Sequence, residues 1–272
     1  MDFGLKNRLS KIFNPKTGKT VMLAVDHGYF QGPTTGLKDM KNIIPLIPNA
    51  DCLFVTRGIL RNCIDPKIET SICLRVSGGP SILGELSNED IIVSMEEAVR
   101  LNASGVGMSI FVGAQNEDRT VSNLGRLVNE AERYGMPVLA ITAVGKEMVR
   151  DSRYLGLACR MAAEIGAQIV KTYYCDDFHK VVEGCPVPIV IAGGKKLPEM
   201  DALLMTEGAI KAGAKGVDMG RNIFQSDSPA GMIKAVRAIV HKGATAQEAY
   251  EIYQKSKKSS AVEMADTAME KV

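Results

Sequence analysis

The chain has 272 residues, of which 46% are hydrophobic and 24% are charged, a composition that buries one large core and excludes a disordered protein. Its 33 basic and 31 acidic residues leave a formal net charge of +2, which provides no electrostatic footprint for nucleic acid or for an anionic membrane. Any anion must therefore be bound by local residues.

Short apolar runs alternate with segments of helical periodicity along the chain. Eight runs are predicted strands, over residues 21–26, 52–56, 72–77, 105–112, 138–143, 169–173, 187–192 and 216–219. Predicted helices cover roughly 87–101, 118–134, 150–165, 198–212 and 228–241. The first of them opens at Ser87-Asn88-Glu89-Asp90, which has the Ser-x-x-acid pattern of a capping box.

Eight strand and helix units in one chain predict an α/β fold, a single (β/α)8 TIM barrel spanning residues 1–272. Residues 1–20 form an N-terminal extension, and residues 243–272 form an extra C-terminal helix with a charged tail. A doubly wound open sheet is the alternative. It is disfavoured because the turn after the first strand, Asp26-His27-Gly28, lacks the Gly-x-Gly-x-x-Gly fingerprint of that fold.

Targeting and metal-binding signals are absent from the sequence. The six cysteines form no Cys-x-x-Cys pair and the three histidines are dispersed, so we expect reduced thiols and no metal. The N-terminus has no apolar core of signal-peptide length, and no run approaches the roughly 18 apolar residues that span a bilayer. We expect a cytoplasmic protein with no membrane partner.

Lys171 stands out because it interrupts the apolar run of the sixth predicted strand. Burial of an unpaired ammonium favours the neutral amine, and a neutral lysine amine forms Schiff bases with carbonyl substrates. Two other interpretations are open: the side chain extends to solvent at the end of the strand, or it pairs with a structural carboxylate.

Two glycine-containing loops follow the seventh and eighth predicted strands, the position at which barrels of this kind commonly bind phosphate. The first holds Gly193, Gly194 and Lys195, and the second holds Gly220 and Arg221. Glycines let backbone N–H groups approach an anion, and each loop adds a basic side chain. Ordinary turns between strand and helix are the alternative interpretation of each loop.

Asp26 and His27 follow the first predicted strand, at the same end of the barrel as Lys171. Asp26 could hold the Lys171 amine, transfer protons or accept a hydrogen bond from a substrate hydroxyl. A helix cap is its structural alternative. His27 either contacts substrate or packs, because strand alternation turns it to the opposite face.

These motifs resemble the archaeal-type class I fructose-bisphosphate aldolase family over about residues 8–253. The resemblance rests on Ala24-Val25-Asp26-His27-Gly28, Ile169-Val170-Lys171-Thr172-Tyr173-Tyr174, Ile191-Ala192-Gly193-Gly194-Lys195-Lys196 and Met219-Gly220-Arg221-Asn222-Ile223-Phe224. It implies a TIM barrel with Lys171 as the covalent lysine, Asp26 as its carboxylate partner, and the two glycine loops around a phosphate. It also implies a ring-shaped homo-oligomer, expected to be a decamer.

One departure from that family changes the expected reaction. Its aldolases place a tyrosine general acid near the end of the fifth strand, where this chain has Ala143. Residues 12–20 and 26–36 are similar to members that act last in the breakdown of phosphorylated autoinducer-2. The resemblance implies acetyl transfer from a phosphorylated dione to coenzyme A, a co-substrate for which the sequence has no recognisable binding motif.

Two alternatives remain open at this stage. The first is a Schiff-base aldolase, a lyase that acts on fructose 1,6-bisphosphate or a related sugar phosphate. The second is a protein that binds a sugar phosphate without reacting with it. Binding alone does not require a buried amine, so Lys171 together with Asp26 argues against the second alternative.

Overall fold

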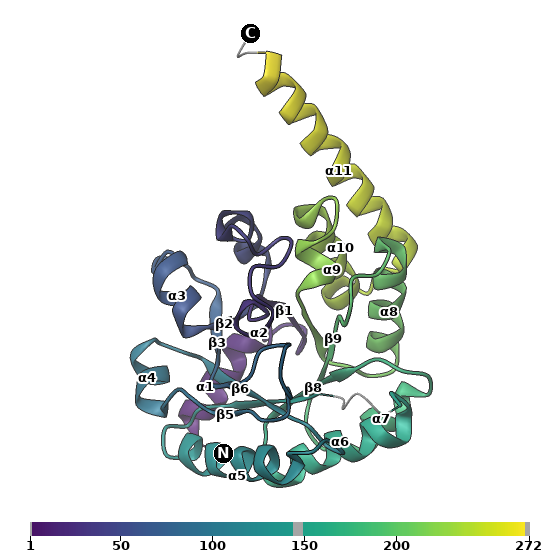
Figure 1. Ribbon diagram of the computed structural model, residues 1–272. Coiled ribbons are helices and arrows are strands. Elements are labelled where there is room, and N and C mark those ends of the chain that lie inside the picture. The colour runs from purple at the N-terminus through teal and green to yellow at the C-terminus, as the bar shows by residue number, and fades with distance from the viewer. Residues whose placement is uncertain (1, 144–148, 270–272) are drawn as a thin grey trace.

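Eight parallel strands close into a barrel in the computed structural model, which describes residues 2–143 and 149–269 (Figure 1). The order around the barrel is β1-β10-β9-β8-β7-β6-β3-β2. This confirms the predicted TIM barrel. The barrel strands are β1 (Thr20–Ala24), β2 (Cys52–Thr56), β3 (Ser71–Arg75), β6 (Gly105–Ile110), β7 (Val138–Thr142), β8 (Ile169–Tyr173), β9 (Ile189–Ala192) and β10 (Gly216–Met219).

Almost every strand residue is buried, because one face of each strand fills the barrel and the other packs against helices. The inner cluster contains Met22, Phe54, Leu139 and Val190, and the outer cluster joins the strands to the surrounding helices. Gly107 makes room for the ring of Phe54, since a Cβ at that position would lie 2.5 Å from a ring carbon. The interior is therefore a packed core.

Helices follow the strands in the expected order. The four long predicted helices are confirmed as α5 (Glu117–Glu132), α6 (Ser152–Ile165), α8 (Glu199–Lys211) and α10 (Pro229–Lys242). Gly166 and Gly213 follow α6 and α8 with φ of +113° and +106°, as expected of helix-ending glycines. Shorter helical segments are α2 (Gly28–Gln31), α3 (Arg57–Cys63), α7 (Phe178–Glu183), α9 (Arg221–Phe224), η1 (Met40–Asn42) and η2 (Ile44–Asn49).

The predicted helix start at Ser87 is wrong. Helix α4 spans Met95–Arg100, and its N-cap is Ser94, whose Oγ accepts a hydrogen bond from the Glu97 N–H at 3.3 Å. Ser94-x-x-Glu97 repeats the capping pattern seven residues after Ser87. The earlier segment instead forms β5 (Asp90–Ile91), paired antiparallel with β4 (Ser77–Gly78), because Glu89 is drawn into the barrel by a buried charge.

The N-terminal extension closes the bottom of the barrel. Helix α1 (Phe3–Ile12) begins at Asp2, which caps it by accepting from the Leu5 N–H at 2.7 Å. Ile12 is fully buried in the inner cluster, against the amino ends of the strands. The N-terminal extension therefore contributes to the barrel core through Ile12.

The expected C-terminal helix is α11 (Ala246–Met269), which extends well beyond the barrel (Figure 1). Its first part packs on α8 and α10, where Tyr253 is buried. Lys257 holds it to Asp227 through a 2.7 Å ion pair. Helix therefore replaces the expected charged tail over residues 255–258, and residues 270–272 lie outside the described range.

Candidate active site

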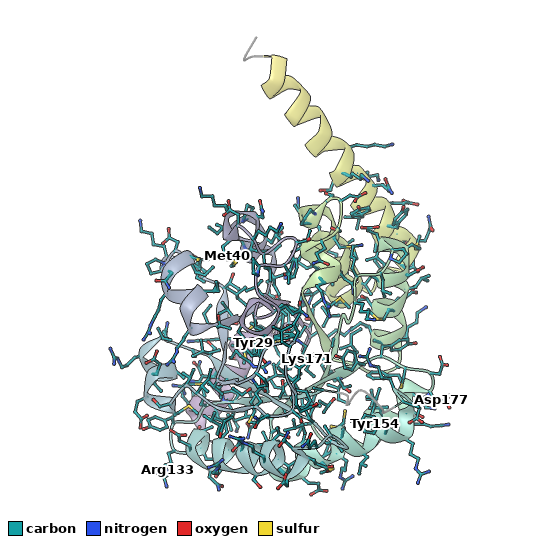
Figure 2. All side chains as sticks on the ribbon, viewed as in Figure 1. Tyr29, Met40, Arg133, Tyr154, Lys171 and Asp177 are labelled. Atoms are coloured by element: carbon teal, nitrogen blue, oxygen red, sulfur yellow. The ribbon has the colours of Figure 1, made fainter. Side chains whose placement is uncertain are left out.

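Lys171 lies inside the barrel in the middle of β8, at the centre of the molecule in Figure 2. Only 8% of the residue is exposed. Its Nζ lies 2.7 Å from Oδ2 of Asp218 and 5.3 Å from the centroid of the Phe54 ring. The opposite charge offsets part of the cost of burying the ammonium. The interpretation in which the amine extends to bulk solvent is wrong.

Asp218, on β10, is the direct ion-pair partner of Lys171, a place that the sequence analysis gave to Asp26. Burial raises the pKa of the Asp218 carboxyl above its usual range, and the Lys171 charge opposes that rise. Oδ1 has no hydrogen-bond donor among the described residues. The sequence carried a signal for this residue, since a carboxylate interrupts the apolar run Gly216–Met219.

Asp26 belongs to a neighbouring group of buried charges. Its Oδ2 lies 3.2 Å from Nη1 of Arg75, and Nη2 of Arg75 lies 2.6 Å from Oε1 of Glu89. All three residues are no more than 6% exposed. Two carboxylates therefore share one guanidinium at the upper end of β3, which explains why Glu89 is turned inward.

Arg75 links five groups around this end of the barrel. It donates from Nε to the Ser77 carbonyl at 3.1 Å, and from Nη2 to Ser109 Oγ at 2.8 Å and to the Tyr29 hydroxyl at 2.6 Å. Tyr29 in turn donates to Glu89. Burial alone would lower the pKa of Arg75, but Glu89 and the other acidic neighbours raise it. Burial raises the pKa of the Tyr29 phenol, so Tyr29 keeps its proton at neutral pH.

The two glycine loops meet Lys171 in one cavity of about 400 Å³. The structure thus brings together the whole predicted set, and the cavity lining includes Lys171, Asp26, His27, Gly193, Gly194, Lys195, Gly220 and Arg221. Gly194 has φ of +67°, a backbone conformation that favours glycine. Arg221 has a buried Nε with no hydrogen-bond partner among the described residues, so a donor is available to an anion.

Asn222 joins the two loops and was missed by the sequence analysis. It is fully buried, donates from Nδ2 to the Gly193 carbonyl at 2.6 Å, and accepts at Oδ1 from the Leu197 N–H at 2.7 Å. A Cβ on Gly220 would lie 2.4 Å from the Ala24 carbonyl oxygen. These contacts hold both loops in fixed positions relative to each other and to β1.

His27 sits between Asp26 and the loop that follows β10. Its ring meets the Phe224 ring edge-on, with 5.8 Å between centroids, and its Cε1 lies close to Gly220. Burial lowers the pKa of the imidazole to about 4. His27 is therefore neutral at pH 7 and lines the cavity next to the proposed anion site.

Ala143 lines the cavity at the end of β7, where aldolases of the resembled family carry their phenol. The next residues in the chain, Val144, Gly145 and Lys146, lie outside the described range. Two other phenols reach the cavity, those of Tyr29 and Tyr173. The Arg150 guanidinium lies 3.8 Å from the centroid of the Tyr173 ring.

The chemistry-bearing residues gather at this one end of the barrel. Two larger hollows, of about 680 and 620 Å³, lie at the opposite end beside the residues that precede the strands, and Lys171 lines neither. Within residues 2–143 and 149–269, no group of three His, Cys, Asp or Glu side chains is arranged to hold a metal ion. No helix in those ranges is both long and apolar enough to cross a membrane.

A family model for DeoC/LacD family aldolases matches residues 20–226, which contain the whole barrel and every cavity residue named above. The chain belongs to this family. The DeoC/LacD assignment agrees with a lysine inside a barrel of parallel strands.

Two curated relatives are similar over most of their length. The 3-hydroxy-5-phosphonooxypentane-2,4-dione thiolase of Escherichia coli strain K12 is 58% identical over 255 residues, covering 93% of this chain and 88% of the relative. The protein of the same name from Photorhabdus laumondii is 57% identical with the same coverage.

Solved structures of aldolases have the same fold. One is an archaeal fructose 1,6-bisphosphate aldolase, with a TM-score of 0.80, 30% identity, and coverage of 88% of this chain and 100% of that one. A second archaeal aldolase has its catalytic lysine bound to a carbinolamine intermediate; its TM-score is 0.77 and its identity 29%, with 87% and 99% coverage. The fold is therefore shared with aldolases, one of which reacts through a catalytic lysine.

Proposed function

We propose that this chain is a thiolase that cleaves 3-hydroxy-5-phosphonooxypentane-2,4-dione with coenzyme A, giving dihydroxyacetone phosphate and acetyl-CoA. The observation that carries the proposal is one cavity that joins Lys171 to the two glycine loops and to Ala143. The identity of 58% to curated thiolases over 93% of the chain supports the choice of substrate.

The substrate phosphate is bound by the loops that follow β9 and β10. Its donors are the backbone N–H groups of Gly193 and Gly194, the buried Nε of Arg221 and the ammonium of Lys195. The link from Asn222 to Gly193 keeps the loops in place before substrate arrives. An anchored phosphate directs the ketone at C4 of the dione towards the barrel axis, where Lys171 lies.

Lys171 attacks that ketone and forms an iminium with loss of water. Asp218 is placed to take the ammonium proton, because Oδ2 is 2.7 Å from Nζ and burial raises the pKa of its carboxyl. The iminium withdraws electrons from C3, so the bond between C2 and C3 breaks when a thiol adds to the acetyl carbonyl. Because the iminium acts as the electron sink, this step does not need a metal ion.

The role that we give to Asp26 follows from the position of its carboxylate. Arg75 holds its Oδ2 at 3.2 Å and leaves Oδ1 facing His27, so the carboxylate sits beside the reacting carbons at a fixed angle. We assign to Asp26 the hydrogen bond to the C3 hydroxyl of the substrate. The buried contacts of Arg75 with Asp26 and Glu89 keep the Asp26 side chain oriented.

The test is acetyl-CoA formation by purified protein supplied with the dione and coenzyme A, followed by mass spectrometry. Wild-type protein should form acetyl-CoA and dihydroxyacetone phosphate in equal amounts, and Lys171→Ala should form neither. Borohydride reduction with dihydroxyacetone phosphate should add mass at Lys171 alone. Product formation without coenzyme A, or adduct on another residue, would refute the assignment.

Aldol cleavage is the second candidate, and the structural similarity to archaeal fructose 1,6-bisphosphate aldolases favours it. It requires an acid at the leaving oxygen, and at the family position this chain has Ala143. Incubation of the wild-type protein with fructose 1,6-bisphosphate and no thiol separates the two. Turnover at a rate comparable with thiolysis would favour the aldolase.

We also propose where in the cell the protein acts and how its copies assemble. A reaction that consumes coenzyme A and acts on phosphorylated autoinducer-2 products belongs in the cytoplasm. We also propose a homo-oligomer, expected to be a decamer, in which the projecting part of α11 contacts another copy (Figure 1). Light scattering on the intact chain measures the oligomeric state, and a monomer at micromolar concentration would contradict it.

A further inference from the structure

His27 combines two features that packing alone does not require. Its Nδ1 is buried, has no hydrogen-bond partner among the described residues, and lies 3.7 Å from Oδ1 of Asp26. His27 also lines the cavity that contains Lys171. Nδ1 thus faces a carboxylate, and the residue borders the space in which substrate would react.

Its immediate neighbours keep the imidazole neutral in the empty site. Burial is the main cause that lowers the pKa of His27, and Lys171, Arg221 and Arg75 lower it further, while Asp26 raises it. The Phe30 and Phe224 rings flank it on the remaining sides. A phosphate dianion bound at Arg221 would offset the positive charge of that guanidinium. It would thereby raise the pKa of His27 and make it a stronger base when substrate is present.

Thiolysis needs a base, because a thiol of pKa about 8.5 is only a few per cent thiolate at pH 7 and the thiolate is the nucleophile. The other titratable groups of the cavity are committed. Lys171 becomes an iminium and Asp218 faces it, Asp26 holds Arg75, and the Tyr29 phenol is bonded to Glu89. Arg150, Lys195 and Arg221 are cations, and Tyr173 is a phenol, a weak base.

We propose that His27 is the catalytic base that takes the proton from the thiol of coenzyme A, with Asp26 orienting the imidazole through Nδ1. This inference rests on the proposed thiolase function and adds a role to it. Asp26 favours the tautomer with the proton on Nδ1, which leaves the Nε2 lone pair to accept the thiol proton.

The thiol proton moves to Nε2, and the thiolate sulfur bonds to C2 of the dione, whose carbonyl becomes an alkoxide. The carbonyl re-forms as the bond between C2 and C3 breaks, and its electron pair passes to the Lys171 iminium as an enamine. The imidazolium returns its proton to C3, and water then hydrolyses the iminium to free dihydroxyacetone phosphate and Lys171.

The experiment compares His27→Gln and His27→Asn with wild type in two assays. Borohydride trapping of dihydroxyacetone phosphate on Lys171 should stay within about threefold, because it needs no thiol. Acetyl-CoA formation at pH 7 should fall by about 10² to 10⁴, the usual contribution of a general base. The matched control is His179→Gln, the same change at an exposed histidine of α7, which should leave both rates unchanged.

A second readout separates a base from a residue that only packs. The deficit of the His27 variants should shrink as the pH rises towards 8.5, because coenzyme A then supplies its own thiolate. An acidic aryl thiol in place of coenzyme A should shrink it at pH 7. Three outcomes would each overturn the role of His27. They are a deficit that stays constant in both series, equal losses in trapping and thiolysis, and thiolysis within threefold of wild type.

The same data separate this inference from the proposed function. If wild-type protein forms no acetyl-CoA from the dione, the thiolase proposal fails and the role of His27 fails with it. If wild type is active and the His27 variants are equally active, only the base assignment fails.

Discussion

Nζ of Lys171 and Oδ2 of Asp218 lie 2.7 Å apart inside the barrel, on strands separated by β9 alone. Neither side chain is more than 10% exposed. Each charge loses its solvation when the barrel closes, and the attraction between the two charges offsets that loss. Removing one partner leaves the other charge buried without compensation, which is strongly destabilising. The pair therefore couples the stability of the barrel to the reactivity of the amine.

A double-mutant cycle should reveal that coupling. Asp218→Asn and Lys171→Met should each lower the free energy of unfolding by about 3 kcal/mol, since each leaves the other group buried without its counter-charge. The double variant should lose less than the sum by about 1 to 3 kcal/mol. Urea unfolding followed by circular dichroism measures all four proteins.

The chain contains a matched control for this cycle on α7. Lys180 and Asp177 are also 2.7 Å apart, but their side chains are more than half exposed. Their Met and Asn variants should show a coupling of roughly 0.5 kcal/mol or less. Additive losses at Lys171 and Asp218, equal to the control, would contradict a desolvated pair.

Basic residues of the proposed anion site should differ in their effect on KM. Arg221→Met removes the buried Nε donor and should raise KM for the phosphorylated substrate about 10- to 100-fold, the usual cost of a charged hydrogen bond. Lys195→Met should raise KM by a smaller factor. Initial rates at varied dione concentration, with saturating coenzyme A, measure both.

Lys196→Met provides the control for these variants. Its amine is 2.8 Å from Glu199 and is not part of the cavity lining, so KM should stay within about twofold of wild type. Inorganic phosphate should inhibit wild type competitively and inhibit Arg221→Met more weakly. Equal KM values for Arg221→Met and Lys196→Met would move the phosphate elsewhere.

The barrel was predictable because its signals are local. Each strand is an apolar run, and helix ends such as Gly166 and Gly213 carry their own glycine. Lys171 could be selected for the same reason, since a charge inside such a run is visible in one dimension. The loops after β9 and β10 followed from the general rule that barrels bind at the carboxyl ends of strands.

Pairings across the barrel were not predictable in this way. Asp218 and Asp26 are both carboxylates at strand ends, and only the closed barrel shows that Asp218 faces Lys171 while Asp26 faces Arg75. Ser87-x-x-Asp90 and Ser94-x-x-Glu97 both match a capping box, but only the second starts a helix. The helix start at Ser87 is excluded by the ion pair of Arg75 with Glu89 inside the barrel. That pair is a tertiary contact, so the sequence alone does not reveal it.

The depressed pKa of His27 should appear as a pH dependence of stability. Between pH 6.5 and about 4 the unfolded chain binds a proton at this residue that the folded chain excludes. The free energy of unfolding therefore falls as the pH drops through that window and is unaffected above it. A shift from 6.5 to about 4 corresponds to about 3 kcal/mol of that loss.

Comparison with His27→Gln isolates this contribution, because glutamine does not titrate. Urea unfolding at pH 7, 6, 5 and 4 should show a steeper loss in wild type than in the variant, with the difference growing as the pH falls. Groups that do not interact with His27, such as Asp51, affect both proteins equally. Parallel curves for the two proteins would mean that His27 is protonated as readily in the folded state as in the unfolded chain.

Ala143 tests how far one position separates thiolysis from aldol cleavage. Ala143→Tyr would place a phenol at the end of β7, inside the cavity that holds Lys171. It should raise cleavage of fructose 1,6-bisphosphate by about 10² or more, because a positioned acid contributes that much to proton transfer. It should also slow acetyl-CoA formation, since the larger side chain occupies space near the reacting carbonyl.

Ala143→Phe separates the acid from the volume of the ring. The phenylalanine variant should slow acetyl-CoA formation to the same degree as Ala143→Tyr and leave aldol cleavage at the wild-type level. Coupled assays for glyceraldehyde 3-phosphate and for acetyl-CoA measure both reactions on the same preparations. If Tyr and Phe change aldol cleavage equally, the missing phenol is not what keeps this barrel from acting as an aldolase, and the cavity shape around Lys171 must be responsible.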